Sequence, residues 1–225
     1  MNGCDCGAIC HLCSKRSTPP KPYYQDLTAG LTIYHGDCLE ILPTITADLV
    51  LTDPPYNVGL DYSEGDNRND YPAYCRSWFD KCPRPLVLTP GMVNLAMWMT
   101  LQPPNWTCAW IKPNQCSPSA LRGFNTWEPI LVYGKLTKRV GQDSWITPIG
   151  QQSDVGDHPC PKYLPFWIKL LAAISEESQT ILDPFLGSGT TLRAAKELKR
   201  KAIGIEREER YCEIAANRLR TQFLF

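Results

Sequence analysis

Short apolar runs alternate with longer amphipathic runs from Leu31 almost to the end of the chain, and this alternation constrains the fold most. Strands that alternate with helices form a sheet that is covered by helices. We therefore predict an α/β fold, with a seven-stranded, mostly parallel sheet layered between helices. The expected strands are residues 31–35, 48–52, 86–89, 106–111, 130–133, 180–182 and 202–205, and the expected helices are residues 71–82, 92–101, 166–174, 190–198 and 208–219.

The length of 225 residues suits one domain with a small appendage. We predict that residues 1–22 form a separate Cys-rich segment and that residues 23–225 form the domain. Lys and Arg together number 23, as do Asp and Glu, so the net charge neither indicates nor excludes a nucleic-acid partner. No signal peptide is recognisable and no apolar run approaches the ~20 residues of a membrane helix, so we expect a cytoplasmic protein with no membrane partner.

The eleven cysteines of a cytoplasmic chain are expected to be thiols or metal ligands rather than disulfides. Four thiolates suit tetrahedral zinc, although the spacing here is tighter than that of two knuckles separated by a longer loop. Two interpretations stay open for the N-terminal segment, a structural zinc site or a flexible tail with free thiols. The candidate ligands are Cys4, Cys6, Cys10, His11 and Cys13.

Residues 52–57 read Thr-Asp-Pro-Pro-Tyr-Asn and directly follow the apolar run 48–51. This pattern predicts a buried strand that ends in a carboxylate, because two prolines continue neither a strand ladder nor a helix. Asp53 is then held at the carboxyl end of a strand, with Tyr56 just beyond it. In open α/β sheets ligands bind at that edge. An Asp-Pro turn without function is the alternative interpretation of Asp53.

A second motif, residues 180–191, reads Thr-Ile-Leu-Asp-Pro-Phe-Leu-Gly-Ser-Gly-Thr-Thr. An apolar strand leads into Asp183, and a glycine-rich turn then leads into a helix near Thr190. Gly187 and Gly189 allow the backbone to approach a ligand closely. The turn is neither Gly-x-Gly-x-x-Gly nor a phosphate loop with Gly-Lys-Ser/Thr, so a nucleoside without phosphate fits it better.

The strand that follows the glycine-rich turn ends Ala202-Ile203-Gly204-Ile205-Glu206. An acidic residue at this place accepts hydrogen bonds from ribose hydroxyls in dinucleotide-binding folds. We predict the same role for Glu206. The alternative is a solvated carboxylate at the start of the charged run 206–210.

The two motifs together resemble those of the S-adenosylmethionine-dependent DNA amino-methyltransferases, which methylate exocyclic nitrogens of adenine or cytosine. Asp53-Pro54-Pro55-Tyr56 is similar to the catalytic motif of the family, and Asp183-Pro184-Phe185-Leu186-Gly187-Ser188-Gly189-Thr190-Thr191 to its cofactor motif. The resemblance extends to segments 35–39, 110–113, 127–131 and 158–162. It implies that the cofactor S-adenosylmethionine is bound by Asp37, Cys38, His158, Lys162, Asp183, Pro184, Phe185, Gly187, Ser188, Gly189, Thr190 and Glu206.

The order of the motifs resembles the circularly permuted β group, because the catalytic motif precedes the cofactor motif. In the usual strand numbering of methyltransferases, the chain is then expected to run 3-4-5-6-7-1-2. Two features depart from the family. Tyr163 stands where a proline usually follows Lys162, and the target-recognition loop, about residues 134–157, is short and lacks periodicity. A short loop presents few side chains to base edges, so we expect a short target site or loose specificity.

The resemblance implies a double-stranded DNA partner and a target base that is flipped out of the duplex. We predict that the base stacks on Tyr56, and that the Asp53 carboxylate and the Pro54 carbonyl accept the two amino hydrogens. Asp at position 53 resembles the adenine-N6 enzymes more than the cytosine-N4 enzymes. The alternatives are a cytosine-N4 DNA methyltransferase, an RNA adenine methyltransferase, and a non-catalytic nucleic-acid-binding module. The protein is expected to be a monomer or a homodimer.

Basic residues in two places are candidates for phosphate contacts. The first group lies in the target-recognition loop, and the second lies on or just after the helix that follows the glycine-rich turn. For the second group, a solvated helix face is the favoured interpretation. The groups are Lys135, Lys138 and Arg139, and Arg193, Lys196, Lys199, Arg200 and Lys201.

Overall fold

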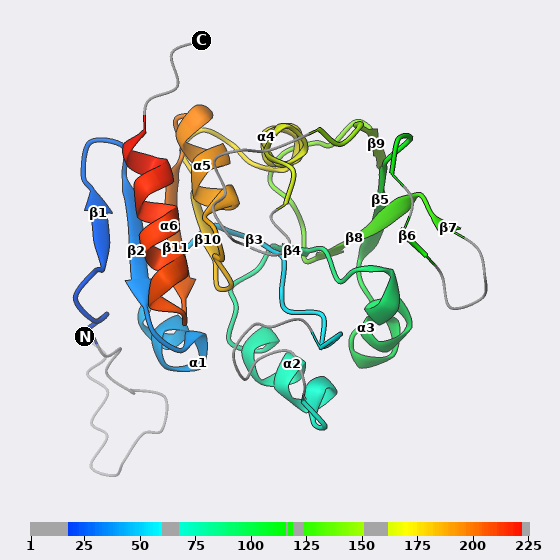
Figure 1. Cartoon of the computed structure of the whole chain (residues 1–225), viewed down its shortest axis with the longest axis horizontal. Helices are drawn as coiled ribbons and strands as arrows, with labels where there is room; N and C mark the ends of the chain where they lie inside the picture. The colour runs from blue at the N-terminus through cyan, green and yellow to red at the C-terminus, as the bar shows by residue number, and fades with distance from the viewer. Residues whose placement is uncertain (1–17, 60–67, 116, 119–123, 151–161, 222–225) are drawn as a thin grey trace, which may run out of the picture.

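A computed structural model of the chain describes residues 18–59, 68–115, 117–118, 124–150 and 162–221. Its centre is a mixed nine-stranded sheet (Figure 1). In spatial order the strands are β1 (Tyr24–Asp26), β2 (Leu31–His35), β11 (Lys201–Glu206), β10 (Thr180–Asp183), β3 (Leu49–Thr52), β4 (Leu86–Leu88), β8 (Trp127–Tyr133), β5 (Trp106–Ile111) and β9 (Ser144–Ile146).

Strand pairing confirms the predicted permutation. From β2 to β5 the order reads 3-2-1-4-5-7-6 in the methyltransferase numbering, because β10 and β11 close the chain but lie in the middle of the sheet. Strands β2, β11, β10, β3 and β4 are parallel, and β8 runs antiparallel to both β4 and β5. The carboxyl ends of the parallel strands therefore share one edge of the sheet, which we call the carboxyl edge. The opposite side is the amino edge.

Helices cover both faces of the sheet. Apolar side chains of α4 (Leu164–Ile174), α5 (Thr190–Glu197) and α6 (Glu209–Arg220) share one core cluster with alternate strand residues, and in Figure 1 α5 and α6 lie in front of β10 and β11. The second cluster joins the other strand face to α1 (Cys38–Ile41), α2 (Tyr71–Phe79) and α3 (Leu95–Leu101). The two-sided burial explains why the strands read as continuous apolar runs rather than alternating ones.

Aromatic packing holds both helical layers against the sheet. On one face Phe166 stacks on Trp110, with ring centroids 4.0 Å apart and an interplanar angle of 6°. On the other, Trp78 meets Trp98 at 5.6 Å and Phe185, next to the glycine-rich turn, at 4.9 Å. Large aromatic rings bury much area with few rotatable bonds, so the cofactor motif is tied directly to the core.

Two predictions about regular structure are corrected. The sheet has β1 and β9 at its two ends, in addition to the seven strands expected, and a small hairpin pairs β6 (Ser117–Pro118) with β7 (Phe124–Asn125). β9 lies inside the stretch that was expected to lack regular structure. It is only three residues long and pairs with β5 alone, while the Trp145 side chain is buried in the core. So short a strand has no measurable periodicity in sequence.

The interpretation of the second basic group as a solvated face is wrong for two of its members. Arg193 is 2% exposed and donates to the carbonyls of Arg218 and Thr221, and Arg200 is 5% exposed and donates to the Ser175 carbonyl. Their guanidinium groups satisfy carbonyls at the C-terminal ends of α6 and α4. Neither side chain is available to a nucleic acid.

Several predictions concern residues outside the described ranges. The proposed zinc ligands Cys4, Cys6, Cys10 and Cys13 lie there, as does His158. Among the described residues, the thiols of Cys38, Cys75, Cys82, Cys108 and Cys212 are free and buried, and no cluster of metal-ligating side chains is present. No helix in the described ranges is long and apolar enough to span a membrane.

Candidate active site

Acidic side chains stand at the carboxyl edge on four neighbouring strands. Asp37 follows β2, Glu206 ends β11, Asp183 ends β10 and Asp53 follows β3. Pairing of His35 with Glu206 and of Leu182 with Val50 fixes their relative heights. Residues far apart in sequence thus form one row, at the place where open α/β sheets bind ligands.

The catalytic and cofactor motifs meet in direct contact. β3 and β10 are hydrogen-bonded neighbours, and the Thr52 hydroxyl donates to Asp183 Oδ1 at 2.7 Å. The Thr191 hydroxyl donates to the other carboxylate oxygen of Asp183 and itself accepts from Trp167 Nε1 at 2.9 Å. Burial raises the pKa of Asp183 to about 6, although both hydroxyls stabilise the charged form.

The glycine-rich turn between β10 and α5 requires its glycines. Gly187 and Gly189 have φ angles of 53° and 86°, the left-handed region that side chains disfavour. Gly189 also caps α5, and a Cβ atom there would lie 2.8 Å from the Ala215 Cβ on α6. The close approach of α5 to α6 therefore fixes where the turn lies.

The Glu206 carboxylate holds the turn from the neighbouring strand. It is 9% exposed and accepts from the backbone N–H of Gly187 at 2.7 Å and of Glu208 at 2.8 Å. Burial raises its pKa, while these backbone donors stabilise the charge. The interpretation of Glu206 as a solvated carboxylate is therefore wrong, because the side chain is buried and bonded to two loops. The Arg207 backbone also stabilises this charge.

Asp37 and Cys38 lie next to Glu206 but differ in what they present. Asp37 Oδ1 accepts from the Leu39 N–H at 2.7 Å and so caps α1. The Cys38 side chain is buried in the core under α1, where burial raises the pKa of its thiol. Only the backbone of Cys38 therefore faces the carboxyl edge as a candidate ligand.

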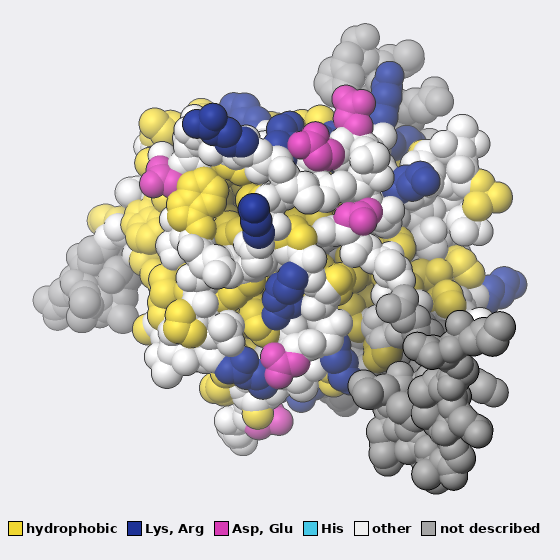
Figure 2. Space-filling view, turned by 180° about the vertical axis from the view of Figure 1, so that it is seen from behind, with side chains coloured by type: hydrophobic (Ala, Val, Ile, Leu, Met, Phe, Trp, Pro, Cys, Tyr) yellow, Lys and Arg dark blue, Asp and Glu magenta, His cyan; other side chains and the backbone are white. Residues whose placement is uncertain are grey.

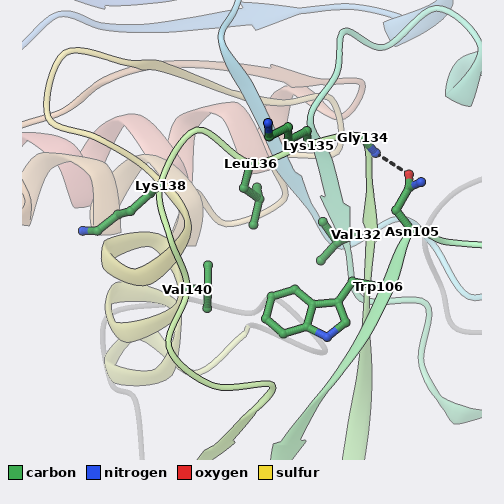
Figure 3. A pocket seen from close by; sticks show the side chains of 8 residues that line it. All are labelled: Asn105, Trp106, Val132, Gly134, Lys135, Leu136, Lys138 and Val140. Atoms are coloured by element: carbon green, nitrogen blue, oxygen red, sulfur yellow. Dashed lines mark hydrogen bonds between the residues drawn. The ribbon is translucent and has the colours of Figure 1, made fainter.

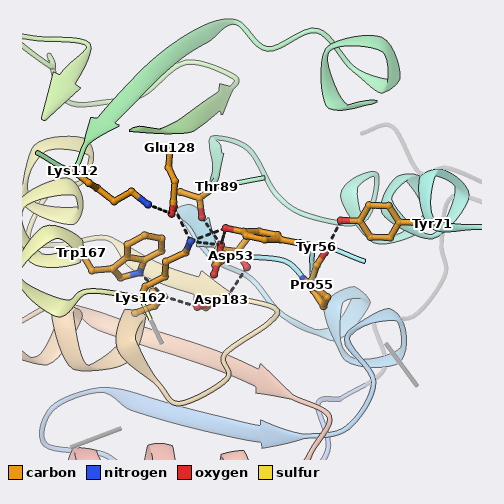
Figure 4. Close-up of polar contacts among 12 residues, drawn as sticks. Asp53, Pro55, Tyr56, Tyr71, Thr89, Lys112, Glu128, Lys162, Trp167 and Asp183 are labelled. Carbon is orange, nitrogen blue, oxygen red and sulfur yellow. Dashed lines mark hydrogen bonds and ion pairs between the residues drawn. The ribbon is translucent and has the colours of Figure 1, made fainter. Parts of the chain in front are cut away.

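Asp53 is the centre of a dense group of polar contacts (Figure 4). Its Oδ1 accepts from the hydroxyls of Tyr56 and Thr89, both at 2.6 Å, and lies 3.1 Å from Lys162 Nζ. Thr89 follows β4, so three parts of the chain meet on one oxygen atom. Burial raises the pKa of Asp53, and the nearby ammonium and hydroxyl groups oppose that rise.

Lys162 connects Asp53 to a second pair of charges. Its Nζ lies 2.7 Å from the Tyr56 hydroxyl and 2.9 Å from Glu128 Oε2, and Lys112 Nζ lies 2.6 Å from Glu128 Oε1. Burial alone would lower the pKa of Lys162, but Asp53 and Glu128 outweigh it and raise the pKa well above the usual value. Lys162 is therefore charged, and Tyr163 in place of the family proline does not keep it from the site.

The backbone of the catalytic motif is held by residues from α2 and from the start of α3. The Tyr71 hydroxyl donates to the Pro55 carbonyl at 2.5 Å, and Asn94 Nδ2 donates to the Tyr56 carbonyl at 2.8 Å. No described residue donates to the Pro54 carbonyl. Asn94 also lies 3.4 Å from the Tyr71 hydroxyl, so the two donors brace each other.

Sequence reasoning missed the residues that surround Asp53. They come from five separate parts of the chain, and no spacing in the sequence connects them: Thr89, Lys112, Glu128, Tyr71 and Asn94. Lys112 and Glu128 stand in segments that resemble the family, 110–113 and 127–131, but were given no role of their own. Cross-strand pairing of Trp110 with Glu128 could have indicated the contact, had the register of β5 and β8 been known.

A cavity of about 400 Å³ lies at the amino edge, away from these residues (Figure 3). Trp106, Val132, Leu136 and Val140 form its apolar part, and Lys135 and Lys138 stand at its margin. The predicted target-recognition loop thus begins at the amino edge, where Gly134 N–H donates to Asn105 at 2.7 Å. Only after β9 does the loop return to the carboxyl edge. Lys138 donates to the Ala172 carbonyl at 2.7 Å, so its charge faces the end of α4.

The back of the molecule, turned by 180° from Figure 1, carries basic side chains scattered among apolar and acidic ones (Figure 2). They do not gather there into a continuous stripe. This face therefore has no strongly basic patch, in keeping with the equal numbers of basic and acidic residues, 23 of each.

Known proteins with similar sequences are DNA-modifying enzymes. A family model described as DNA methylase (N6_N4_Mtase) matches residues 136–217, which include the cofactor motif but not Thr52–Asn57. The type II methyltransferase M.ScaI of Streptomyces caespitosus is 27% identical, over 90% of this chain and 84% of its own length. M.HinfI of Haemophilus influenzae is 28% identical, over 84% of this chain and 68% of its own length.

Solved structures share the fold. The PvuII DNA methyltransferase, described as cytosine-N4-specific, superposes with a TM-score of 0.71 at 17% identity, over 93% of this chain and 92% of that one. A complex of M1.HpyAVI with SAM gives 0.65 at 23% identity, over 85% of this chain and all of that one. The fold and the comparisons together define an S-adenosylmethionine-dependent methyltransferase. More narrowly, the sequence is similar to the N6_N4_Mtase DNA methylases and to type II methyltransferases, so the resemblance predicted from the two motifs is confirmed.

Proposed function

We propose that this enzyme methylates the exocyclic amine of a base flipped out of double-stranded DNA, with adenine N6 as the favoured target. The observation that carries the proposal is the contact between the two motifs, in which Thr52 of β3 bonds to Asp183 of β10. It puts the candidate amine acceptor, Asp53, beside the candidate cofactor loop. Transfer of a methyl group requires such closeness, because the donor and the amine must align within reach of each other.

The residues at the carboxyl edge fit S-adenosylmethionine, which supplies an electrophilic methyl group on a sulfonium. The cofactor has ribose hydroxyls and a positive charge but no phosphate. Carboxylates at Asp37, Asp183 and Glu206 suit it, and the turn 184–189 contains no lysine or arginine. We assign cofactor binding to Asp37, the backbone of Cys38, His158, Lys162, the segment Asp183–Thr190 and Glu206, with Glu206 next to the ribose.

On the amine side, Asp53 and the Pro54 carbonyl are the proposed hydrogen-bond acceptors. An exocyclic amine is a poor nucleophile because its lone pair is delocalised into the ring. Two acceptors that hold its hydrogens favour a tetrahedral nitrogen whose lone pair points at the methyl group. The neighbouring carbonyls of Pro55 and Tyr56 already accept from Tyr71 and Asn94, whereas no described residue donates to Pro54.

Tyr56 is the proposed stacking platform for the flipped base. Its ring lies against Gly91, where a Cβ atom would be 2.8 Å from the ring. Its hydroxyl donates to Asp53 Oδ1. An amine that binds this same oxygen displaces the hydroxyl, at the cost of one charge-assisted hydrogen bond.

The identity of the base is decided by mass spectrometry of nucleosides from DNA treated with the purified protein. We expect N6-methyl-2′-deoxyadenosine, because Asp53 resembles the adenine-specific motif. N4-methylcytosine would support the second candidate, which is favoured by the structural likeness to the PvuII enzyme. Methylation of RNA but not of DNA would contradict the DNA proposal. Absence of transfer to either would indicate a non-catalytic binding module.

The same preparation tests the remaining proposals. Mass measurement of the native protein distinguishes a monomer from a homodimer. Metal analysis tests for zinc on Cys4, Cys6, Cys10 and Cys13.

Modification-sensitive sequencing of DNA from cells that express the protein would reveal the target site and its length. We propose a cytoplasmic location in a prokaryotic or phage-infected cell, as suits a relative of restriction–modification methyltransferases.

A further inference from the structure

We propose that Gly91 is a positioning residue for methyl transfer: it covers one face of the Tyr56 ring and thereby assigns the opposite face to the flipped base. This inference rests on the proposed function, because it assumes that the base stacks on Tyr56. It gives a role to the segment 89–94, between β4 and α3, to which sequence reasoning gave no function.

The backbone of Gly91 lies against a face of the Tyr56 ring rather than against its edge. A Cβ atom at Gly91 would be 2.8 Å from Cε2, 3.0 Å from Cδ2 and 3.1 Å from Cζ. An approach in the plane of the ring would leave the two flanking atoms much farther away than the middle one, whereas an approach from above makes the three distances nearly equal. All three are shorter than the about 3.5–4.0 Å at which carbon atoms attract, so a side chain at this position displaces the ring.

The backbone conformation of Gly91 also requires glycine. Its φ of 67° and ψ of 161° fall in a region that is essentially restricted to glycine. The residue stands immediately before the 3-10 turn Met92–Asn94, which leads into α3. Two requirements, one of conformation and one of space, therefore coincide at the position that meets the ring.

The residues on both sides of Gly91 fix it relative to the catalytic motif. Thr89 is fully buried and donates its hydroxyl to Asp53 Oδ1 at 2.6 Å (Figure 4). Asn94 is 8% exposed and donates from Nδ2 to the Tyr56 carbonyl at 2.8 Å. The segment 89–94 thus contacts the carboxylate, the ring and the backbone of the motif, and it sets the ring at a defined place beside the proposed amine acceptor.

The contact with Gly91 leaves one face of Tyr56 for stacking. Lys162 Nζ lies 2.7 Å from the Tyr56 hydroxyl but 5.1 Å from the ring centre, so it contacts the end of the side chain and not a face. Tyr56 is half-buried, so part of the side chain stays accessible. A flat base stacks on a ring face, and Gly91 takes one of the two faces, so stacking is confined to the other.

The size of the expected effect follows from this geometry. A methyl group at position 91 moves the Tyr56 ring by roughly 0.7 Å if ordinary contact distances are to be restored. The ring would move toward the side on which the base stacks, and the base would move with it. A misplacement of about 1 Å between reacting groups can lower a rate by about 100-fold, so even part of this shift is measurable.

The test is a double-mutant cycle of Gly91→Ala and Tyr56→Ala in single-turnover transfer of a labelled methyl group to unmethylated plasmid DNA. Single turnovers exclude product release from the rate. We expect Gly91→Ala to lower the rate at least tenfold when Tyr56 is present, and less than threefold in Tyr56→Ala, where no ring is left to displace. The Kd for S-adenosylmethionine should change less than twofold in each variant.

Gly30→Ala is the matched control. Gly30 has a φ of 68°, and a Cβ atom there would be 2.8 Å from the Lys201 side chain, so the substitution imposes a similar strain. Gly30 directly precedes β2 and lies at the amino edge, away from the catalytic motif. Its methyl-transfer rate should equal that of wild type, even where urea unfolding shows a lower stability.

Two results would overturn the role of Gly91 alone. One is a Gly91→Ala variant that transfers methyl groups at the wild-type rate. The other is an equal loss in both backgrounds, up to a failure to fold, because the effect would then come from backbone strain. If Tyr56→Ala is too slow to measure, urea unfolding completes the cycle: Gly91→Ala should destabilise the protein more with Tyr56 than without it, and equal destabilisation overturns the ring contact. A wild type that transfers no methyl group to DNA overturns the proposed function and this inference together.

Discussion

The two motifs at the carboxyl edge are stabilised in different ways. The cofactor motif, Asp183–Thr191, is held by backbone geometry and by hydrogen bonds to its neighbours on β11 and α5. The catalytic motif, Thr52–Asn57, is held by side chains that follow β4, that belong to α2 and that precede α4. β8 acts on it only through Lys162. The difference teaches that a ligand loop can be encoded locally, whereas an acceptor for a reacting amine is assembled from distant parts of the chain.

Gly189→Val should have the largest effect, because a side chain at this position is incompatible with the backbone conformation of the cofactor motif. The residue has φ of 86°, and a Cβ atom would lie 2.8 Å from Ala215. We expect loss of S-adenosylmethionine binding by calorimetry and destabilisation of about 1–3 kcal/mol in urea unfolding. Gly141→Ala is the control, since no atom lies within 4 Å of its added Cβ. Unchanged cofactor binding in Gly189→Val would show that the turn tolerates displacement.

Substitution of Tyr56 tests the catalytic motif without touching the cofactor motif. Base–aromatic stacking contributes about 1–3 kcal/mol, so Tyr56→Ala should lower kcat/KM for DNA roughly 10- to 100-fold. Tyr56→Phe keeps the ring but releases Asp53 and Lys162 from its hydroxyl, and should lose less. If both variants lost activity equally, the hydroxyl rather than the ring would be the important group.

Asp183 links the two motifs and makes stability depend on pH. Its folded pKa of about 6 lies above the ordinary value of 3.8, so the protonated form is favoured in the folded state. Its contribution is fully present below about pH 4 and is lost as pH rises through 6. Relative to wild type, Asp183→Asn should therefore gain about 2 kcal/mol of unfolding free energy between pH 4 and pH 7. Parallel urea titrations at the two pH values provide the measurement, and a constant difference would contradict the raised pKa.

The basic residues at the amino edge should have the smallest effect. Lys135 and Lys138 lie beside the remote cavity, and Lys138 already donates to α4. We expect Lys135→Ala to change the Kd for DNA and its dependence on salt concentration by less than twofold. A reduction of the salt slope by about one would mean that this lysine contacts a phosphate.

The strands, turn and helix of the cofactor motif were predicted from sequence because their determinants are local. Strands β10 and β11, the glycine-rich turn and α5 follow one another in the chain, and each carries its own pattern of apolar residues and glycines. The permuted order then placed β3 beside β10 correctly. The three-residue strand β9 was beyond reach, since its pairing depends on β5 and on the burial of Trp145.

The catalytic half was predicted only at its centre. Asp53 and Tyr56 stand in one motif, but Glu128 and Lys112 reach them through the register of β5 and β8. The two arginines Arg193 and Arg200 were also misjudged, because charge alone does not reveal that they cap the C-terminal ends of α6 and α4. The contacts of these four residues depend on tertiary structure, which the local sequence pattern does not reveal.

The most direct test of the account measures methyl transfer and S-adenosylmethionine binding side by side in Asp53→Ala. The substitution removes the amine acceptor but leaves the turn at Gly187–Gly189 and its bond to Glu206. We predict that transfer to DNA falls by at least a thousandfold while the cofactor Kd stays within a fewfold of wild type. A folded Asp53→Ala protein that still transfers methyl groups, or that loses the cofactor, would contradict the division of labour between the two motifs.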